Sequence, residues 1–442
     1  MLVAVLPRAG SPIAQRLLSG AFWSLAGEAG ARILTLLSAI VVARQLGAAE
    51  FGAFALIQST ITMLTIFAGF GMGQTASRYV ATHRSGEKAR VAEICNLTVT
   101  FSAAMGLVAA FALYVFAPMI ASSILNRPDL AGVLRLSSLV LLLSAIAGAA
   151  NGVLIGFEAF KDIARNTWAS SVVSFLATVT GVWTGGLTGA VIGLVLGELF
   201  RCVLAFAMAR SVLRGHGLAF LATSGLKEAR LIWEFGLPSA LGSLLNAPVI
   251  WVCQTMVAAH PNGLAELGIY DAALKWLTVV SILPLAASAA FLPVLSSLSQ
   301  DGTNHKRATL QLGFFQFGVT ALTALPVALA APFAMQVFGP SFAPGVPVVV
   351  IMMLLAPVFV INRLCWQVLT SMGRAWSSLL IWMLWGVLAL GLTWAWQEGG
   401  ALGLAKANLA ASVITLSASM TVIRGFWRER TPAVDLSAGT AW

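Results

Sequence analysis

Twelve apolar runs of about 20 residues follow one another along this chain, and a helix of that length crosses a lipid bilayer. They span 20–43, 52–75, 93–117, 133–155, 167–184, 188–209, 235–258, 268–295, 311–335, 347–370, 377–396 and 401–423. Only 10% of the 442 residues are charged, whereas soluble globular domains carry about 25%. The runs therefore predict an all-α polytopic membrane protein with 12 transmembrane helices, and they exclude an ordinary water-soluble enzyme.

The lysines and arginines are distributed unevenly between the two sides of these runs. Most of the 26 fall in the two terminal tails and in the segments that follow every second span. Cytoplasmic segments of membrane proteins carry such an excess, so we predict that both termini are cytoplasmic. This distribution accounts for the formal net charge of +10, and we expect no nucleic acid as a partner.

An internal duplication is visible in the segments between the runs. The sequence GAAEFG at 47–52 is repeated as GLAELG at 263–268, an offset of 216, and the motif GGxxG at 185–189 recurs at 399–403, an offset of 214. Each half has six spans, an even number, so both halves enter the membrane in the same sense. We predict two parallel six-helix repeats around a central cavity, an arrangement typical of transporters that alternate access by rocking one half against the other.

The repeats also set the expected domain boundaries and turns. The boundaries are 1–209 for the N-terminal lobe, 210–234 for a cytoplasmic linker, 235–423 for the C-terminal lobe and 424–442 for a cytoplasmic tail. We expect Gly47 and Gly263 to adopt a positive φ that stops the preceding helix. Glu50 and Glu266 then fall in the first turn of the next helix, where a carboxylate meets the positive end of the helix dipole.

The first hairpin resembles that of a known transporter family. Residues 23–56 read WSLAGEAGARILTLLSAIVVARQLGAAEFGAFAL, and a glycine-rich exit, GFGMG, follows at 69–73. This segment resembles the polysaccharide transporter (O-antigen/oligosaccharidyl-lipid flippase) family of the multidrug/oligosaccharidyl-lipid/polysaccharide flippase superfamily. Beyond the hairpin the resemblance extends only to the pattern of 12 spans, the duplication and the short loops.

The resemblance implies a multi-pass protein of the bacterial inner (cytoplasmic) membrane. Such a protein moves an undecaprenyl-diphosphate-linked oligosaccharide from the cytoplasmic to the outer leaflet by alternating access, for the synthesis of cell-surface polysaccharide. The lipid-linked oligosaccharide and the bilayer are then its main partners, and components of polysaccharide polymerisation and export are further ones.

Ionisable side chains inside the spans are costly, so they mark a functional site by default. Three acidic–basic pairs share a helix face and one arginine has no local acidic neighbour: Glu28–Arg32, Glu198–Arg201, Asp271–Lys275 and Arg363. The second and third pairs have two open interpretations, mutual neutralisation that holds helices together or contact with the transported molecule. For the first pair and for the lone arginine we favour a role in the cavity.

Guanidinium groups bind phosphate oxygens bidentately, so a diphosphate head group needs such cations. The predicted contacts to the diphosphate and glycan are Arg32, Arg363, Lys275 and Arg201. The candidates for ion coupling are Glu28, Glu198 and Asp271. Protonation of Glu28 would free Arg32 for the substrate, which would link proton binding to substrate binding.

Other function classes fit the sequence less well. A polyprenyl-linked glycosyltransferase or polymerase needs close carboxylates for general-base or metal chemistry, and the short outer loops hold no such pair, so we expect no enzyme and no cofactor. The histidines are scattered and the four cysteines lack metal-ligand spacing, so we expect no metal site and buried thiols. The alternative is a cation-coupled multidrug exporter of the same superfamily, whose cavity would hold carboxylates without arginines.

Overall fold

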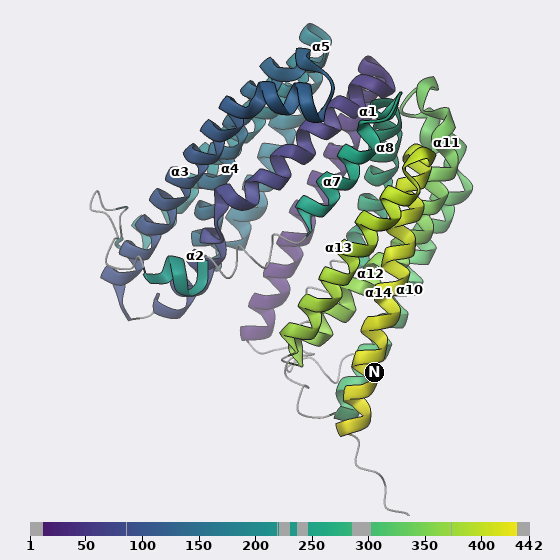
Figure 1. Cartoon of the computed structure of the whole chain (residues 1–442). Coiled ribbons are helices and arrows are strands. Elements are labelled where there is room, and N and C mark those ends of the chain that lie inside the picture. Colours follow the sequence, from purple (N-terminus) through teal and green to yellow (C-terminus); the bar gives the residue numbers. More distant parts are fainter. Residues whose placement is uncertain are drawn as a thin grey trace, which may run out of the picture.

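The computed structural model describes residues 12–84, 86–218, 220, 230–236, 246–284, 302–372 and 374–430. Every regular element in these ranges is a helix, which confirms the predicted all-α class. Figure 1 shows two bundles side by side. We call helices α1 to α5 the N-terminal bundle and helices α7 to α14 the C-terminal bundle.

The helices of each bundle have the following bounds. The N-terminal bundle contains α1 (Pro12–Gly69), α2 (Met72–His83), α3 (Lys88–Met119), α4 (Ala131–Gly156) and α5 (Phe160–Gly215). The C-terminal bundle contains α7 (Ala247–Ala258), α8 (Gly263–Val280), α10 (Gly302–Leu329), α11 (Ala331–Gln336), α12 (Val346–Ser371), α13 (Ala375–Ala395) and α14 (Gly400–Arg430). Short π or 3-10 helices lie at Ile120–Ile124, Pro128–Leu130, Ile232–Gly236, Pro340–Gly345 and Gln397–Gly399.

These helices supply the twelve predicted spans. Within the described ranges, eight helices are long and apolar enough to cross a membrane. Two of them, α1 and α5, contain a reversal and hold two spans each. The remaining two spans are α7 and α8. They are not among the eight because α7 is only 12 residues long and α8 carries more charged side chains. Parts of the predicted spans 235–258 and 268–295 lie outside the described residues.

Glycines make both reversals. The helical backbone is interrupted at Gly47 in α1, where φ is 74°, and at Gly185 and Gly186 in α5. Gly186 has φ 55° and ψ −135°, and its counterpart Gly400, at the offset of 214, has φ 55° and ψ −131°. Glycine adopts such a conformation without steric cost. The repeated GGxxG motif therefore forms the same turn twice, which confirms the duplication in three dimensions.

The two bundles touch each other through counterpart small residues. Gly52 in α1 and Gly268 in α8 are separated by the offset of 216, and so are Ala48 and Leu264. A Cβ on Gly52 would overlap the carbonyl oxygen of Leu264, and a Cβ on Gly268 would overlap that of Ala48. Each contact is the image of the other, so a pseudo-twofold axis passes between them. Because each half has six spans, an even number, the two halves run in the same sense, and the prediction of parallel repeats is confirmed.

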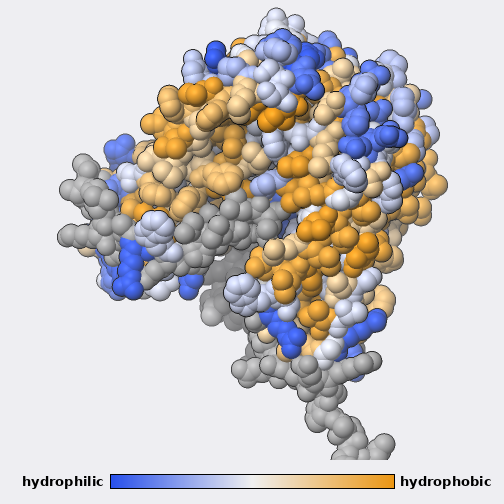
Figure 2. Space-filling view, in the orientation of Figure 1, coloured by the Kyte–Doolittle hydropathy of each residue, from blue (hydrophilic) through white to orange (hydrophobic). Residues whose placement is uncertain are grey.

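Further contacts between the bundles lie at this same end of the molecule. The Nε of Arg44 donates to the carbonyl oxygen of Val337 at 2.6 Å, and the ring of Phe51 lies 5.8 Å from that of Phe342. Figure 1 shows the bundles converging at this end, at the top of the view, and diverging at the other. We call these the closed end and the divergent end. Figure 2 shows apolar side chains over the sides of both bundles and hydrophilic ones near the two ends.

The turns that begin the second span of each half differ from the expectation at one position. Gly47 has a positive φ, but in the second repeat the positive φ of 61° belongs to Asn262, so the expectation for Gly263 is wrong. A different constraint selects glycine there, because a Cβ on Gly263 would overlap the carbonyl oxygen of Val257. Gly47 is thus required by its backbone conformation, and Gly263, the first residue of α8, by close packing.

The two repeated glutamates have diverged in their partners. Glu266 lies in the first turn of α8 as expected, but its carboxylate accepts a hydrogen bond from the backbone N–H of Ala401 at the start of α14, at 2.9 Å. Glu50 instead forms an ion pair of 2.9 Å with Arg127, which also binds Asp129. One glutamate therefore caps a neighbouring helix, whereas the other joins a network of side chains.

The predicted lobe ends fall inside helices, because α5 continues to Gly215 and α14 to Arg430. All four cysteines are buried and have free thiols, as expected. Residues 219 and 221–229 of the predicted linker and residues 431–442 of the predicted tail lie outside the described residues.

Candidate functional site

A cavity of about 370 Å³ lies inside the N-terminal bundle. It is lined by residues 34–39 and 51–62 of α1, on both sides of the Gly47 reversal, and by residues 170–178 and 194–201 of α5, on both sides of the second reversal. Val140 of α4 and Lys275 of α8 complete the wall. Lys275 is the one lining residue from the C-terminal bundle among those described, so the cavity opens toward the partner bundle. Its volume falls in the range of about 300–1,000 Å³ that ligand pockets occupy.

Glycines on one face of α5 let its two halves pack closely beside this cavity. Gly189, Gly193 and Gly197 recur every four residues, so they lie on one face of the helix after the reversal. A Cβ on Gly197 would overlap the Ser174 side chain, and a Cβ on Gly189 would overlap the carbonyl oxygen of Gly181. The two halves of α5 therefore pack closely, and this packing brings Ser174 and Gly197 together in the cavity wall.

Uncharged polar side chains make up much of the wall. Eight of them carry a hydroxyl or an amide: Thr35, Ser38, Gln58, Thr62, Ser170, Ser171, Ser174 and Thr178. Three phenylalanines, Phe51, Phe54 and Phe175, add aromatic surface. Thr178 is 1% exposed, and its Oγ1 has no hydrogen-bond partner among the described residues. The wall thus combines donors and acceptors with flat apolar faces.

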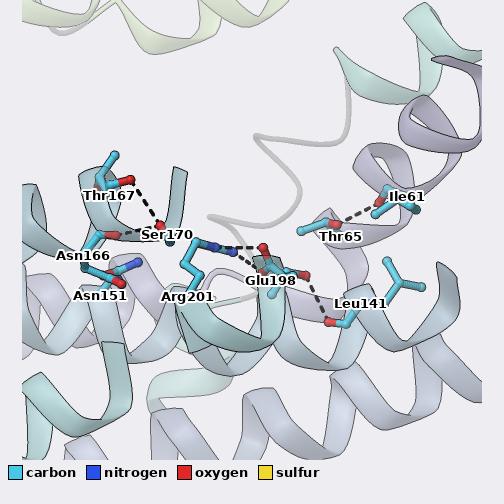
Figure 3. A network of polar contacts seen from close by, with 10 residues as sticks. Ile61, Thr65, Leu141, Asn151, Asn166, Thr167, Ser170, Glu198 and Arg201 are labelled. Atoms are coloured by element: carbon cyan, nitrogen blue, oxygen red, sulfur yellow. Dashed lines mark hydrogen bonds and ion pairs between the residues drawn. The ribbon is translucent and has the colours of Figure 1, made fainter. Parts of the chain in front are cut away.

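The pair Glu198–Arg201 lies in this wall, on the second half of α5. The Nε of Arg201 donates to Glu198 Oε2 at 2.9 Å, and its Nη2 donates to the other carboxylate oxygen. Figure 3 shows the two side chains pointing toward one another, with Ser170 and Asn166 nearby. The carboxylate is only 15% exposed, so the bidentate pair compensates a charge that would otherwise be costly at this depth. As an ion pair, the two side chains neutralise each other's charge.

Lys275 is the second cation of the cavity, and it is also paired. Its Nζ lies 3.0 Å from Asp271 Oδ2, one helical turn away on α8. The approach is off the line of a hydrogen bond, so this buried oxygen has no hydrogen-bond partner among the described residues. Lys275 and Asp271 are 19% and 9% exposed, respectively. The lysine therefore carries N–H donors that remain available toward the cavity.

The other sequence-predicted residues lie elsewhere. Arg32 is one turn from Thr35 on α1, where its Nε binds Glu28 at 2.8 Å and its Nη1 approaches the carbonyl oxygen of Thr278 on α8 at 3.4 Å. It thus bridges the bundles, about 22 Å from Gly47 along the helix. Arg363 is exposed on α12, and neither arginine lines this cavity. The structure brings together Glu198, Arg201 and Lys275, with Asp271 beside them.

The C-terminal bundle has a counterpart of this cavity that is almost closed. A pocket of about 10 Å³ is lined by Ile250, Cys253, Gln254, Tyr270, Trp385, Leu404 and Asn408. Five of these seven are the repeat counterparts, at offsets of 216 or 214, of residues that line the large cavity: Leu34, Ser38, Phe54, Ser171 and Leu194. The two bundles therefore build the same internal position, and larger side chains fill it in the second one.

The hydroxyl-rich wall was not predicted from the sequence. Ser170, Ser174 and Thr178 recur every four residues inside an apolar span, which places them on one helix face. This spacing of four residues is the sequence signal that indicates a polar helix face. Among the described residues, no group of three His, Cys, Asp or Glu side chains could hold a metal ion.

Comparisons of the sequence identify similar proteins. The model of a family described as polysaccharide biosynthesis protein matches residues 17–299. The chain is 25% identical, over 292 residues, to the EPS I polysaccharide export inner membrane protein EpsE of Ralstonia solanacearum, and the match covers 63% of each protein. It is 24% identical, over 333 residues, to the succinoglycan biosynthesis transport protein ExoT of Rhizobium meliloti, with 74% of this chain and 63% of the relative covered. The chain thus spans less than two thirds of the length of these relatives.

Solved structures show the same fold. An inward-facing multidrug resistance MATE family transporter of the MOP superfamily matches with a TM-score of 0.72 and 15% identity, over 91% of this chain and 96% of that one. The lipid II flippase MurJ in an inward closed conformation matches with a TM-score of 0.71 and 13% identity, over 92% and 87% of the two chains. The polytopic twelve-helix arrangement is therefore shared with proteins of this superfamily.

Proposed function

The chain belongs to the polysaccharide biosynthesis protein family, and we propose that it is a flippase for a polyprenyl-diphosphate-linked oligosaccharide. It would move this lipid of undecaprenyl type across the bacterial inner membrane by alternating access, for the synthesis of cell-surface polysaccharide. Components of polysaccharide polymerisation and export are proposed as further partners. In this proposal the protein is a transporter and not an enzyme, in keeping with the export and transport proteins that it resembles.

The observation that carries this proposal is the cavity of the N-terminal bundle. It is polar and of ligand size, and Lys275 from the other bundle completes it. A site shared by two bundles that converge toward one end changes its access when the bundles rock against each other. In the described conformation the Gly52–Gly268 contact lies toward the closed end, which supports access from the divergent end.

We propose that the oligosaccharide enters this cavity while the diphosphate remains nearer the divergent end. Arg201 and Lys275 would then face the glycan, and Arg32 would hold the diphosphate. Arg363 keeps a proposed role in binding the substrate from α12, where its side chain makes no hydrogen bond or ion pair with a described residue. Glu28, Glu198 and Asp271 are the proposed sites of ion coupling, and Glu28 is the first to test because protonation would release Arg32.

The orientation and the lobe boundaries are part of the proposal. The excess of basic residues supports a cytoplasmic location for the divergent end and for both termini. The proposed units are residues 1–209 and 235–423, joined by the segment 210–234 and followed by the tail 424–442.

The test is flipping of a fluorescent polyprenyl-diphosphate oligosaccharide in proteoliposomes. We expect wild-type protein to translocate the lipid, and we expect Arg32→Ala and Arg363→Ala to reduce the rate. If both variants flip the lipid at the wild-type rate, the flippase function stands, but the two arginines have structural roles and do not bind the substrate. Glu28→Gln should remove the dependence of flipping on the proton gradient, and an unchanged dependence would exclude Glu28 from coupling.

The alternative function is export of cationic drugs. Within the cavity each carboxylate has a cationic partner, which disfavours a positively charged ligand. Export of a cationic dye, together with no flipping of several lipid-linked glycans, would support the exporter and overturn our proposal.

A further inference from the structure

The cavity of the N-terminal bundle is balanced in charge. Its two cations, Arg201 and Lys275, are each paired with a carboxylate on the same helix, Glu198 and Asp271. The charge of each cation is therefore already balanced by a carboxylate of the protein, so a new anion gains little unless an existing pair is broken. Net attraction for an acidic ligand is weak at such a site, although the site holds two basic side chains.

Breaking either pair would be costly. Glu198 is 15% exposed and accepts both hydrogen bonds of the Arg201 fork. A carboxylate on the ligand that took this fork would leave Glu198 buried without a partner, and an uncompensated buried charge is strongly destabilising. Two carboxylates beside one guanidinium would also repel each other. The pair thus acts against acidic ligands.

The remaining wall suits an uncharged sugar. Hydroxyl groups of a sugar both donate and accept hydrogen bonds, and the wall offers serine and threonine hydroxyls that do the same. Ser170, Ser174 and Thr178 place such groups along one side, and Thr178 Oγ1 has no partner among the described residues. Phe54 and Phe175 provide flat apolar surface for the C–H faces of a sugar ring. No charged group on the sugar is needed to satisfy this wall.

We infer that this cavity selects neutral sugars, and that Glu198 is the residue that excludes acidic ones. The inference rests on the proposed flippase function and names the class of glycan that the site accepts. The charge of the diphosphate does not conflict with it, because Arg32 lies outside the cavity lining. The C-terminal counterpart of Glu198, at the offset of 214, is Ser412, so this selection belongs to the N-terminal bundle alone.

The experiment compares two fluorescent lipids in proteoliposomes. Both carry the same polyprenyl diphosphate and a trisaccharide of equal length, but one trisaccharide is built of neutral hexoses and the other contains one hexuronate. We expect wild-type protein to flip the hexuronate lipid about tenfold more slowly, the ratio that about 1.4 kcal/mol produces. Glu198→Gln should bring the two rates together or reverse their order, because Arg201 then becomes available to the uronate.

Glu50→Gln is the matched control. It removes a carboxylate that is also paired with an arginine, at 2.9 Å, but that lies outside the cavity, so the preference for neutral sugar should persist. If Glu198→Gln does not fold, the ratio of the two flipping rates of the wild-type protein still tests the inference. Equal or faster flipping of the hexuronate lipid by wild-type protein would overturn this inference and leave the flippase function standing. No flipping of either lipid would overturn the function itself and the inference with it.

Discussion

Equivalent positions inside the two bundles differ in the amount of space that they enclose. In the N-terminal bundle the position is a cavity of about 370 Å³, and in the C-terminal bundle it is a pocket of about 10 Å³. The backbone does not explain this difference, because the Gly186 and Gly400 turns are nearly identical in φ and ψ. Side chains explain it: where the first bundle has Ser171, the second has Trp385.

The two positions also differ in charge. The counterparts of Glu198 and Arg201 are Ser412 and Thr415, so the second bundle has no ion pair at these two positions. Its pocket is lined by Gln254, Tyr270 and Asn408, whose amide and phenol groups are uncharged. Asn408 Nδ2 donates to Tyr270 Oη at 3.2 Å, a bond inside the pocket wall. The comparison teaches that the repeat supplies the same internal position twice, and that only the N-terminal copy has a volume of ligand size.

The largest effect should follow from closing the open site in the same way. Ser171→Trp places in the N-terminal bundle the side chain that fills the C-terminal pocket. We expect flipping in proteoliposomes to fall about a hundredfold, equivalent to about 2.7 kcal/mol on the barrier. Ser171→Ala is the control and should retain most of the rate. Flipping at the wild-type rate by Ser171→Trp would show that the cargo does not use this cavity.

The next effect concerns the contact that both bundles share equally. Gly52→Ala and Gly268→Ala should each destabilise the protein by about 2 kcal/mol, because the added methyl group overlaps a carbonyl oxygen of the other bundle. The measurement is thermal unfolding of the purified protein in detergent. Gly69→Ala is the control, since nothing lies within 4 Å of a Cβ there. Equal stability of all three variants would contradict the close contact.

Opening the closed pocket should have a smaller effect, and on a different property. Trp385→Ser removes a half-buried side chain and leaves space, so we expect a loss of about 1.5 kcal/mol in stability. Flipping should change little, since this pocket carries no cargo in our proposal. A variant that unfolds at the wild-type temperature but no longer flips would instead give the C-terminal pocket a direct role in transport.

The smallest effect should separate the two repeated glutamates. Glu266→Ala removes the acceptor for the backbone N–H of Ala401, and the loss of such a helix cap costs about 1 kcal/mol. Glu50→Ala should cost less, because exposed ion pairs contribute about 0–1 kcal/mol and Arg127 keeps Asp129 as a partner. Thermal unfolding of both variants under the same conditions tests the order. A larger loss for Glu50→Ala would reverse the assignment of the two roles.

Much of the fold could be predicted because it depends on local sequence. Apolar length predicted the spans, the two glycine motifs predicted the repeats, and the even number of spans in each half predicted their sense. The pair Glu198–Arg201 could be predicted from its spacing of three residues, which places both side chains on one face of a helix. The positive φ at Asn262 could not, because either of two adjacent residues can form the turn that precedes α8 and tertiary packing decides between them.

The location of the cavity could not be predicted in the same way. An intramembrane charge has the same sequence signature whether it faces a cavity, a neighbouring helix or the edge of a bundle. Arg32 and Arg363 were therefore grouped with Arg201 and Lys275, although only the latter two line the cavity. Which groups share a space depends on the packing of α1 against both α5 and α8, helices that are far apart in the chain.

The sequence by itself determined that the chain has twelve spans in two parallel halves, because apolar length, basic residues and repeated turns act locally. Only the tertiary structure decided which half holds the site. Ser171 and Trp385 are ordinary residues of apolar spans until folding places both at the same internal position. At that position side-chain volume decides whether space remains. A tryptophan fills the interior of the C-terminal bundle, whereas a serine leaves a cavity in the N-terminal bundle.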